Sequence, residues 1–276
     1  MICILKGCVE ALSKRCMGSM NKVSDNHYYQ PGELRGTRVM NLFDQIAKKY
    51  DLVNDIQSGG LHRWWKHHLI REANVEPGNS ALDVCCGTGD LSFALSAKGA
   101  TVTGVDFSQA MLEEAHQKKA PAASDSDPKS QPTFLRADAM DLPFEDETFD
   151  IVTMAYGLRN LSHWEKGLQE LHRIVRPGGR ILILEFGKPP NAWWKNMYFA
   201  YLRLAVPMIG WSVAGDAAAY QYILTSLHHF PAQRGIESAM VRLGCRQIRT
   251  KLFLGGVMSL NMARKAPSES PISAAE

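Results

Sequence analysis

Glycine and acidic residues between Ala81 and Asp106 have the types and spacing of a site for a small organic ligand. A short apolar run ends at Val84, and Gly87 and Gly89 separate it from a segment that can form a helix, Leu91 to Lys98. Glycine lets the backbone approach a ligand closely, and the N–H groups at a helix start suit a carboxylate or a phosphate. Asp106 ends a second apolar run 17 residues after Gly89 (89 to 106), about where an acid accepts hydrogen bonds from a ribose.

The details of this loop favour S-adenosylmethionine (SAM) over a dinucleotide. A dinucleotide site has the pattern G-x-G-x-x-G, but Ser92 follows Gly87 and Gly89 at the third position, and Cys85 stands where a longer glycine run would begin. Asp83 lies one residue inside the first strand, and an acidic residue before the loop is typical of SAM sites. A glycine turn without a ligand is the structural alternative.

The elements around the loop predict a doubly wound α/β fold. Strands are expected at the ranges 81–84, 101–106, 133–138, 149–155 and 181–186, with helices between them, one of which Ser108 caps. A last helix at 232–243 and a hairpin of strands at 246–253 and 256–262 complete the sheet. This alternation gives a mostly parallel seven-stranded Rossmann-like sheet, the fold of class I SAM-dependent methyltransferases.

Two further regions depart from this alternation. Arg38 to Glu72 carries two amphipathic helical patterns, interrupted from Asp51 to Leu61, which predict a helical cover over the ligand site. Residues 188–231 are dense in aromatic side chains and predict a lid over an apolar substrate. We therefore expect an N-terminal extension at 1–35, one domain at 36–265 with its lid insertion, and a tail at 266–276. The extension is a flexible tail, a start codon assigned too early, or a targeting peptide.

Composition excludes several classes of protein. The net charge is only +3 and the basic residues are dispersed, so no nucleic-acid partner is expected. No run approaches the roughly 20 apolar residues that span a bilayer. The six cysteines form no C-x-x-C pattern, so no metal is expected.

Several independent motifs resemble the ubiquinone/menaquinone biosynthesis C-methyltransferase family. The resemblance extends from about Gly36 to Lys265 and rests on these segments: Phe43–Asn54 with Ser58 and His62–Lys66, Asp83–Asp90, Gly157–Asn160, Arg173–Phe186, and Tyr220–Tyr222 with Ser226 and Phe230–Pro231. It implies a SAM-dependent enzyme that methylates a ring carbon of a prenylated quinol. The doubled cysteine, Cys85–Cys86, is more similar to menaquinone-type members than to ubiquinone-type members.

The resemblance also implies positions for the SAM contacts. They map onto Thr88 in the loop and Asp106 at the ribose, onto Asp138 and Ala139 at the adenine, and onto Ala155 near the transferred methyl group. Many relatives have serine where this chain has Ala155, so a role for a hydroxyl is lost there. With the loop residues, the expected cofactor site is Asp83, Gly87, Thr88, Gly89, Asp106, Asp138, Ala139 and Ala155.

Methylation of an aromatic carbon needs a negatively charged ring, which limits the candidates for catalysis. Ionising a phenol with a pKa near 10 costs about 4 kcal/mol at pH 7, and a positioned cation or a general base can supply much of it. Arg159 follows the fourth strand directly and is the leading candidate, with a surface salt bridge as its alternative role. Asn160 could orient the same oxygen or cap a helix. Tyr220 and Tyr222 could contact the quinol or only pack.

The sequence therefore predicts a demethylmenaquinone methyltransferase-like enzyme that converts demethylmenaquinol to menaquinol with SAM as methyl donor. The alternatives are methylation of 2-polyprenyl-6-methoxy-1,4-benzoquinol in ubiquinone biosynthesis, another methyl acceptor, and a non-catalytic SAM-binding scaffold. The expected partner is a prenylated quinol. A cytoplasmic location with peripheral membrane contact is expected, with an organelle as the alternative, and a homodimer is compatible with the pattern.

Overall fold

The computed structural model describes residues 35–118, 131–214 and 217–267. Most of the expected N-terminal extension, the loop at 120–131 and the tail lie outside these ranges. The limits of the predicted domain, 36 and 265, stay a prediction. The described residues fall almost entirely within these limits.

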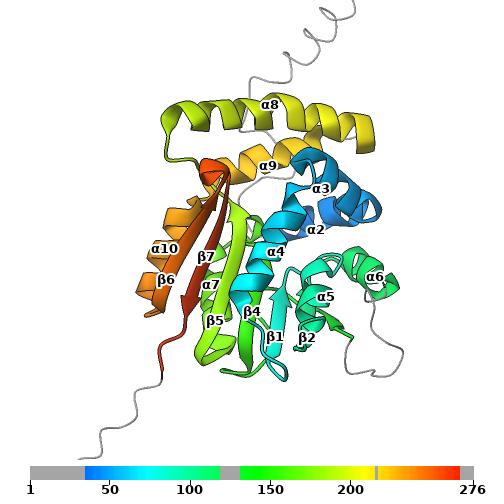
Figure 1. The fold of residues 1–276 in the computed structure, drawn as a ribbon. Coiled ribbons are helices and arrows are strands. Elements are labelled where there is room, and N and C mark those ends of the chain that lie inside the picture. Colours follow the sequence, from blue (N-terminus) through cyan, green and yellow to red (C-terminus); the bar gives the residue numbers. More distant parts are fainter. Residues whose placement is uncertain (1–34, 119–130, 215–216, 268–276) are drawn as a thin grey trace, which may run out of the picture.

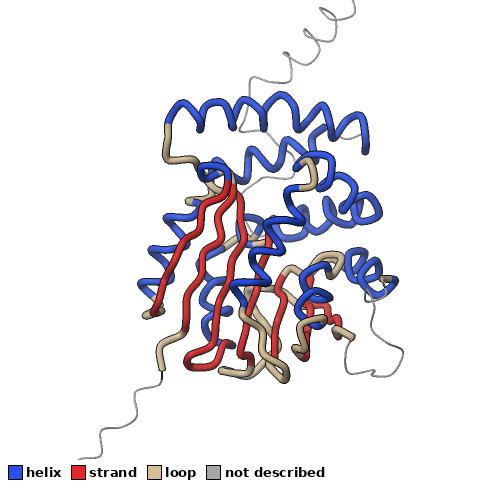
Figure 2. Tube along the Cα trace, in the orientation of Figure 1, coloured by secondary structure: helices blue, strands red, loops and turns tan. Residues whose placement is uncertain are grey.

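One seven-stranded sheet organises the chain (Figures 1 and 2), in the order β3-β2-β1-β4-β5-β7-β6. Pairing is parallel except at β7, which runs antiparallel to both β5 and β6. The strands are β1 (Ser80–Val84), β2 (Thr101–Asp106), β3 (Thr133–Arg136), β4 (Phe149–Ala155), β5 (Val175–Phe186), β6 (Arg246–Phe253) and β7 (Met258–Arg264). The predicted fold class is confirmed, and the predicted bounds of β2 and β4 are those of the structure.

Helices cover both faces of the sheet because its central strands are apolar on both sides. In β4, Ile151 packs with the cluster beneath α4 (Leu61–Ala73) and α5 (Asp90–Ser96), whereas Val152 and Met154 face the opposite cluster. The opposite cluster includes buried residues of α7 (Trp164–Ile174) and α10 (Ala232–Arg242). Parallel strands buried on two faces explain the continuous apolar runs in the sequence.

A further helical layer lies across the carboxyl ends of the parallel strands (Figure 1). It contains α2 (Arg35–Ile46), the short 3₁₀ turn Ala47–Lys49, α3 (Tyr50–Ser58), α8 (Ala192–Ala214) and α9 (Ala217–His229). Its core joins Leu42 and Val53 from the N-terminal helices to Tyr198, Leu202 and Tyr222 from α8 and α9. The two regions that departed from the strand–helix alternation therefore pack against each other.

The predicted interruption between Asp51 and Leu61 is wrong for most of its length. Residues 50–58 form α3, and the break is confined to Gly59 and Gly60, which both have left-handed backbone angles. Asp51 stabilises the first turn of α3, and Gly59 ends the same helix. The polar residues between them, which were expected to form a loop, are therefore helical.

The remaining short helix, α6 (Gln109–Gln117), begins as predicted at Ser108, whose hydroxyl accepts the N–H of Met111 at 3.1 Å. The same hydroxyl donates to Asp44 at 2.5 Å and so links α6 to α2. Within the described ranges, none of the helices combines the length and the apolar character that crossing a bilayer requires.

Candidate active site

The loop after β1 turns sharply through residues with left-handed backbone angles. Cys85, Gly87 and Gly89 have φ values of 56°, 55° and 82°. Cys85 thus takes a conformation that glycine adopts without strain, at the place where a longer glycine run would begin. The backbone N–H groups of the two glycines were expected to bind a ligand, but both are used within the protein. Gly87 N–H donates to Asp106 Oδ2 at 2.9 Å, and Gly89 N–H donates to the carbonyl of Cys86. Neither N–H is left open for a ligand.

Asp106 ends β2 and is oriented by the backbone around it. Its second carboxylate oxygen accepts the N–H of Ser108 at 2.9 Å. Burial raises the pKa of Asp106, and the N–H groups of Ser108 and Gly87 oppose this by stabilising the charged form. The carboxylate is therefore fixed at the edge of a pocket, with lone pairs that can still accept hydrogen bonds.

Asp83 lies beneath the loop and not in the pocket. It is 1% exposed and accepts hydrogen bonds from Ser92 Oγ at 2.7 Å and Thr153 Oγ1 at 2.9 Å. Burial raises its pKa to about 6, despite these two donors. Among the described residues its contacts join β1, α5 and β4, so the structure gives it a role in holding the loop.

A first pocket opens at the carboxyl ends of β1, β2 and β4, and we call it the donor pocket. Of the expected cofactor residues it contains Gly87, Asp106, Asp138, Ala139 and Ala155; Asn160, expected at the substrate, also lies here. Asp83, Thr88 and Gly89 are not among the described residues that line it. Its wall contains apolar side chains, among them Val84, Val105, Met111 and Leu161. It also contains hydroxyl groups, those of Thr37 and Ser162 among them.

Thr88 joins a network of charged residues that ties the helical cover to the loop. Its hydroxyl donates to Asp51 of α3 at 2.9 Å, and Lys118 Nζ lies 2.6 Å from Asp51 and 2.9 Å from Asp90. Lys66 of α4 contacts the other oxygen of Asp90 at 2.8 Å. Burial acts against the charge of Asp90, but Lys66 and Lys118 hold its pKa well below the ordinary range.

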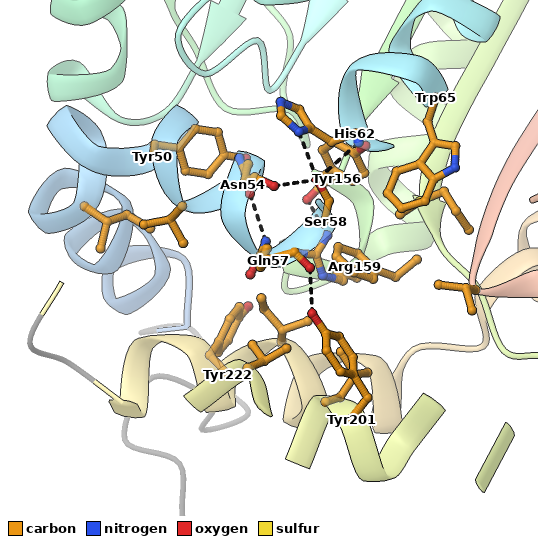
Figure 3. A pocket seen from close by; sticks show the side chains of 18 of the residues that line it. Tyr50, Asn54, Gln57, Ser58, His62, Trp65, Tyr156, Arg159, Tyr201 and Tyr222 are labelled. Atoms are coloured by element: carbon orange, nitrogen blue, oxygen red, sulfur yellow. Dashed lines mark hydrogen bonds between the residues drawn. The ribbon is translucent and has the colours of Figure 1, made fainter. Parts of the chain in front are cut away.

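A second pocket lies between α3, α8 and α9 (Figure 3), and we call it the acceptor pocket. Its lining is mainly aromatic and aliphatic: Leu42, Phe43, Ile46, Tyr50, Val53, Trp65, Tyr156, Phe186, Tyr198, Tyr201, Leu202, Val206, Tyr222, Ile223, Val257 and Met258. Polar side chains of Asn54, Gln57, Ser58, His62 and Arg159 enter from one side. The region predicted as an aromatic lid contains helices α8 and α9, and side chains from both helices form one wall of this pocket.

Phe43, Tyr50 and Tyr156 line both pockets and form a shared aromatic wall. Tyr156 follows β4 with φ of 60°, a strained angle for a residue with a bulky side chain. Its hydroxyl oxygen is buried and has no hydrogen-bond partner among the described residues, and the same holds for Asn160 Oδ1. Buried polar atoms are normally paired, so these two atoms mark places where a ligand completes the site.

Arg159 lies at the polar side of the acceptor pocket in a buried ion pair. Its Nη1 contacts Glu185 Oε1 at 2.6 Å and the carbonyl of Tyr156 at 2.7 Å, and its guanidinium stacks 4.6 Å above Phe186. Burial disfavours the charge, but Glu185 outweighs it and raises the pKa of Arg159. The surface salt bridge expected as the alternative is wrong in its location, because the pair is buried, whereas the role of Arg159 at a ring oxygen stays a prediction. Its Nε is buried and has no hydrogen-bond partner in the described part of the chain.

The other predicted catalytic residues do not lie together in one pocket. Asn160 Nδ2 donates to the carbonyl of Tyr156 at 2.9 Å, in the donor pocket. Tyr222 is buried in the wall of the acceptor pocket, whereas the side chain of Tyr220 is outside the described part of the chain. Asn261 of β7 is buried, and its side-chain amide donates to Thr250 Oγ1 and to the carbonyl of Gln233.

Sequence reasoning missed several residues that line the acceptor pocket. Tyr50, Ser58 and His62 lie in segments quoted for the family resemblance, yet no chemistry was assigned to them. The available signal was the helical spacing of Tyr50, Asn54, Ser58 and His62 at steps of four, which places polar groups along one line across the α3–α4 corner.

The fold and the donor pocket together define the class of protein. A structure described as a SAM-dependent methyltransferase, possible histamine N-methyltransferase, from Thermotoga maritima superposes with a TM-score of 0.56. It covers 82% of this chain and 99% of its own, at 16% identity, and therefore supports the fold alone. The fold is that of the class I SAM-dependent methyltransferases.

The family follows from sequence similarity over most of the chain. The ubiE/COQ5 methyltransferase family matches residues 32–265. A demethylmenaquinone methyltransferase of Desulfitobacterium hafniense is 37% identical over 237 residues, 85% of this chain and 92% of the relative. A ubiquinone/menaquinone biosynthesis C-methyltransferase of Ectopseudomonas mendocina is 38% identical over 239 residues, 85% and 91% of the two chains. The chain belongs to the ubiE/COQ5 methyltransferase family.

Proposed function

We propose that this enzyme transfers a methyl group from SAM to a ring carbon of a prenylated quinol, converting demethylmenaquinol to menaquinol. The observation that carries the proposal is the aromatic wall of Phe43, Tyr50 and Tyr156 between the two pockets. A donor on one side and a flat apolar ring on the other are held next to each other there. Such positioning contributes roughly 7–11 kcal/mol to a reaction between two bound molecules.

The residues of the donor pocket suit SAM, which supplies an activated methyl group on sulfur. Asp106 offers a fixed carboxylate to the ribose hydroxyls, and Asp138 and Ala139 offer a polar and an apolar contact for the adenine. Asn160 and Tyr156 both line this pocket, and among the described residues Asn160 Oδ1 and the Tyr156 hydroxyl are buried without a hydrogen-bond partner.

The residues of the acceptor pocket suit a quinol with an apolar tail. Aromatic side chains from α3, α8 and α9 favour a flat ring, and aliphatic side chains along α8 favour an isoprenoid chain. Arg159 can donate a hydrogen bond to a ring oxygen, because its Nε has no partner among the described residues while Glu185 holds the guanidinium in place. A hydrogen bond from it stabilises the ring oxygen as negative charge develops.

A naphthoquinol acceptor is favoured over a benzoquinol by two observations. The relatives from Desulfitobacterium hafniense and Staphylococcus epidermidis are described as demethylmenaquinone methyltransferases. The doubled cysteine at 85–86 resembles that type of member. Methylation of a benzoquinol in ubiquinone biosynthesis is the alternative, since the Ectopseudomonas relative is named for both pathways.

The proposal is tested by incubating the protein with methyl-labelled SAM and a panel of chemically reduced quinones that lack the ring methyl group. We expect one labelled methyl group on the naphthoquinol ring, identified by mass and fragmentation, and none on the oxidised quinone. Methylation of the benzoquinol alone would select the ubiquinone pathway. SAM binding without transfer to any acceptor would contradict the proposal and favour a scaffold.

A second prediction concerns the buried ion pair. Replacing Arg159 alone leaves the Glu185 charge unpaired, so we expect the double variant Arg159→Met/Glu185→Leu to keep the fold, because both charges are removed together. SAM affinity, measured by calorimetry, changes less than threefold since neither residue lines the donor pocket. Turnover of the reduced quinone falls about 100-fold or more, as for loss of an oxyanion donor.

The matched control is the half-buried pair Lys251 and Glu72, which lies outside both pockets. Lys251→Met/Glu72→Gln retains SAM affinity and turnover. Equal losses of SAM affinity and turnover in the Arg159 double variant would contradict the role of Arg159 at the acceptor.

We also propose that helix α8 contacts a lipid bilayer at its interface. Large apolar side chains of α8 are exposed at steps of three and four residues, on one helix face: Trp193, Met197, Tyr201, Leu204 and Met208. Tyr201 also lines the acceptor pocket and donates to the carbonyl of Gln57 at 2.6 Å (Figure 3). The exposed face is thus continuous with the pocket in which the proposed substrate binds, and a prenyl tail resides in the bilayer.

Vesicle flotation tests this contact. The variant Trp193→Ser/Leu204→Ser/Met208→Ser is expected to bind lipid vesicles at least tenfold more weakly, because each side chain loses apolar area that enters the interface. Leu135→Ser/Val241→Ser, which alters exposed apolar residues elsewhere, binds as the wild type does. Equal binding of vesicles by both variants would contradict the proposal. If the protein forms a dimer that only the α8 variant loses, this face is instead the interface with a second copy of the chain.

A further inference from the structure

The corner between α3 and α4 brings a hydroxyl, an imidazole and a carboxylate into one line at the wall of the acceptor pocket. Ser58 ends α3, His62 lies in the first turn of α4, and Asp55 lies one turn before Ser58. Gly59 and Gly60 make the tight turn between the helices with φ values of 57° and 78°. Ser58 and His62 both line the acceptor pocket, and His62 is 4% exposed.

The distances at this corner suit transfer of a proton. His62 Nδ1 lies 3.1 Å from Ser58 Oγ and 3.6 Å from Asp55 Oδ1 (Figure 3 shows the first contact). Ser58 Oγ also accepts the backbone N–H of His62 at 3.2 Å and lies 2.5 Å from the carbonyl of Asn54. The hydroxyl is therefore held in place while its proton can point to either of two acceptors.

Charges from three helices surround the imidazole. Lys66 and Arg63 lie on its own helix, Asp55 on α3 and Asp90 on α5, and Arg159 lines the same pocket. Burial and Lys66 lower the pKa of His62, while Asp55 and Asp90 act in the opposite direction. The imidazole is thus neutral near pH 7 and able to accept a proton, and the Asp55 carboxylate, which Arg63 holds at 2.6 Å, stabilises the imidazolium that results.

We propose that Ser58 and His62 form the proton relay that ionises the ring hydroxyl of the acceptor, an inference that rests on the proposed quinol methylation. Ser58 contacts the hydroxyl, and His62 positions Ser58 and takes up its proton. Asp55 lies next to the imidazole and Arg159 enters the same pocket as a hydrogen-bond donor.

The proton balance of the relay closes over one turnover. The ring hydroxyl gives its proton to Ser58 Oγ as the proton of Ser58 passes to His62 Nδ1. The ring carbon then bonds to the methyl carbon of the donor, the methyl–sulfur bond breaks, and its electron pair stays on sulfur as the thioether. The same ring carbon loses its hydrogen as a proton to water, which restores the aromatic ring. The ring oxygen recovers its proton from His62 through Ser58, so one proton is released in all.

Two variants test the relay without removing the helix corner. In His62→Asn the amide can still bond to Ser58 but cannot accept a proton, and Ser58→Ala keeps the imidazole but interrupts the path. We expect turnover of the reduced naphthoquinone at pH 7 to fall by about 10²- to 10⁴-fold in each variant, the usual contribution of general base catalysis. His67→Asn, an exposed position on the same helix, is the matched control and keeps full activity.

The pH profile separates a relay from a structural role. Wild-type turnover is expected to level off once His62 is neutral, whereas turnover of the variants continues to rise about tenfold per pH unit, because they depend on quinol that ionises in solution. Affinity for S-adenosylhomocysteine, measured by calorimetry, stays unchanged.

Two outcomes would overturn the relay. If both variants retain the wild-type pH profile, with turnover reduced or not, the corner has only a structural role. A wild-type protein that methylates none of the reduced quinones would overturn the proposed function, and the relay with it.

Discussion

Methyl transfer to carbon requires two molecules in contact with no water between them, and we propose that this chain meets the requirement at the aromatic wall of Phe43, Tyr50 and Tyr156, which lines both pockets. Phe43 lies in α2, Tyr50 begins α3, and Tyr156 directly follows β4, so each residue comes from a different part of the chain. The wall exists only when the N-terminal helices lie across the strand ends, so their packing against α8 and α9 is a condition for both pockets. The backbone strain at Tyr156 is concentrated at this point.

The buried charges of the site are each held by specific contacts. Glu185 is fully buried, pairs with Arg159, and also accepts the N–H of Phe186 at 2.8 Å. Asp106 accepts two backbone N–H groups, and Asp83 accepts two hydroxyls. A buried charge without such partners would cost several kcal/mol, so these contacts are what permit polar groups beside an apolar ring. The network of Asp51, Thr88, Asp90, Lys66 and Lys118 joins this polar floor to the helical cover.

Local pattern predicted the fold, and it placed together several residues that line the donor pocket. The apolar runs and the glycine turn predicted β1, β2 and β4, and Asp106, Asp138, Ala139 and Ala155 line the predicted pocket. Strand ends of a parallel sheet meet at one edge, so their residues could be placed together without knowing any side-chain contact. Thr88 and Asp83 share that edge in sequence, but their side chains turn into the protein, and only tertiary contacts decide such a direction.

The acceptor pocket was much harder to predict because its wall is assembled from distant segments. Tyr50 and Tyr198 are far apart in sequence but line the same pocket. Arg159 lies shortly after β4, whereas its ion-pair partner Glu185 lies in β5. Sequence spacing gave no reason to expect Glu185 to neutralise Arg159. The aromatic density of residues 188–231 did indicate a lid, since such density has few uses other than packing against an apolar ligand or core.

The central claim is that one aromatic wall places the donor's methyl group against the acceptor, and a crystal structure with S-adenosylhomocysteine and a non-reactive reduced naphthoquinone analogue tests it most directly. The account predicts that the ribose contacts Asp106, and that the sulfur and the analogue's ring approach each other beside Tyr50 and Tyr156. A sulfur directed away from this wall, or an analogue bound outside the pocket beneath α8 and α9, would contradict it.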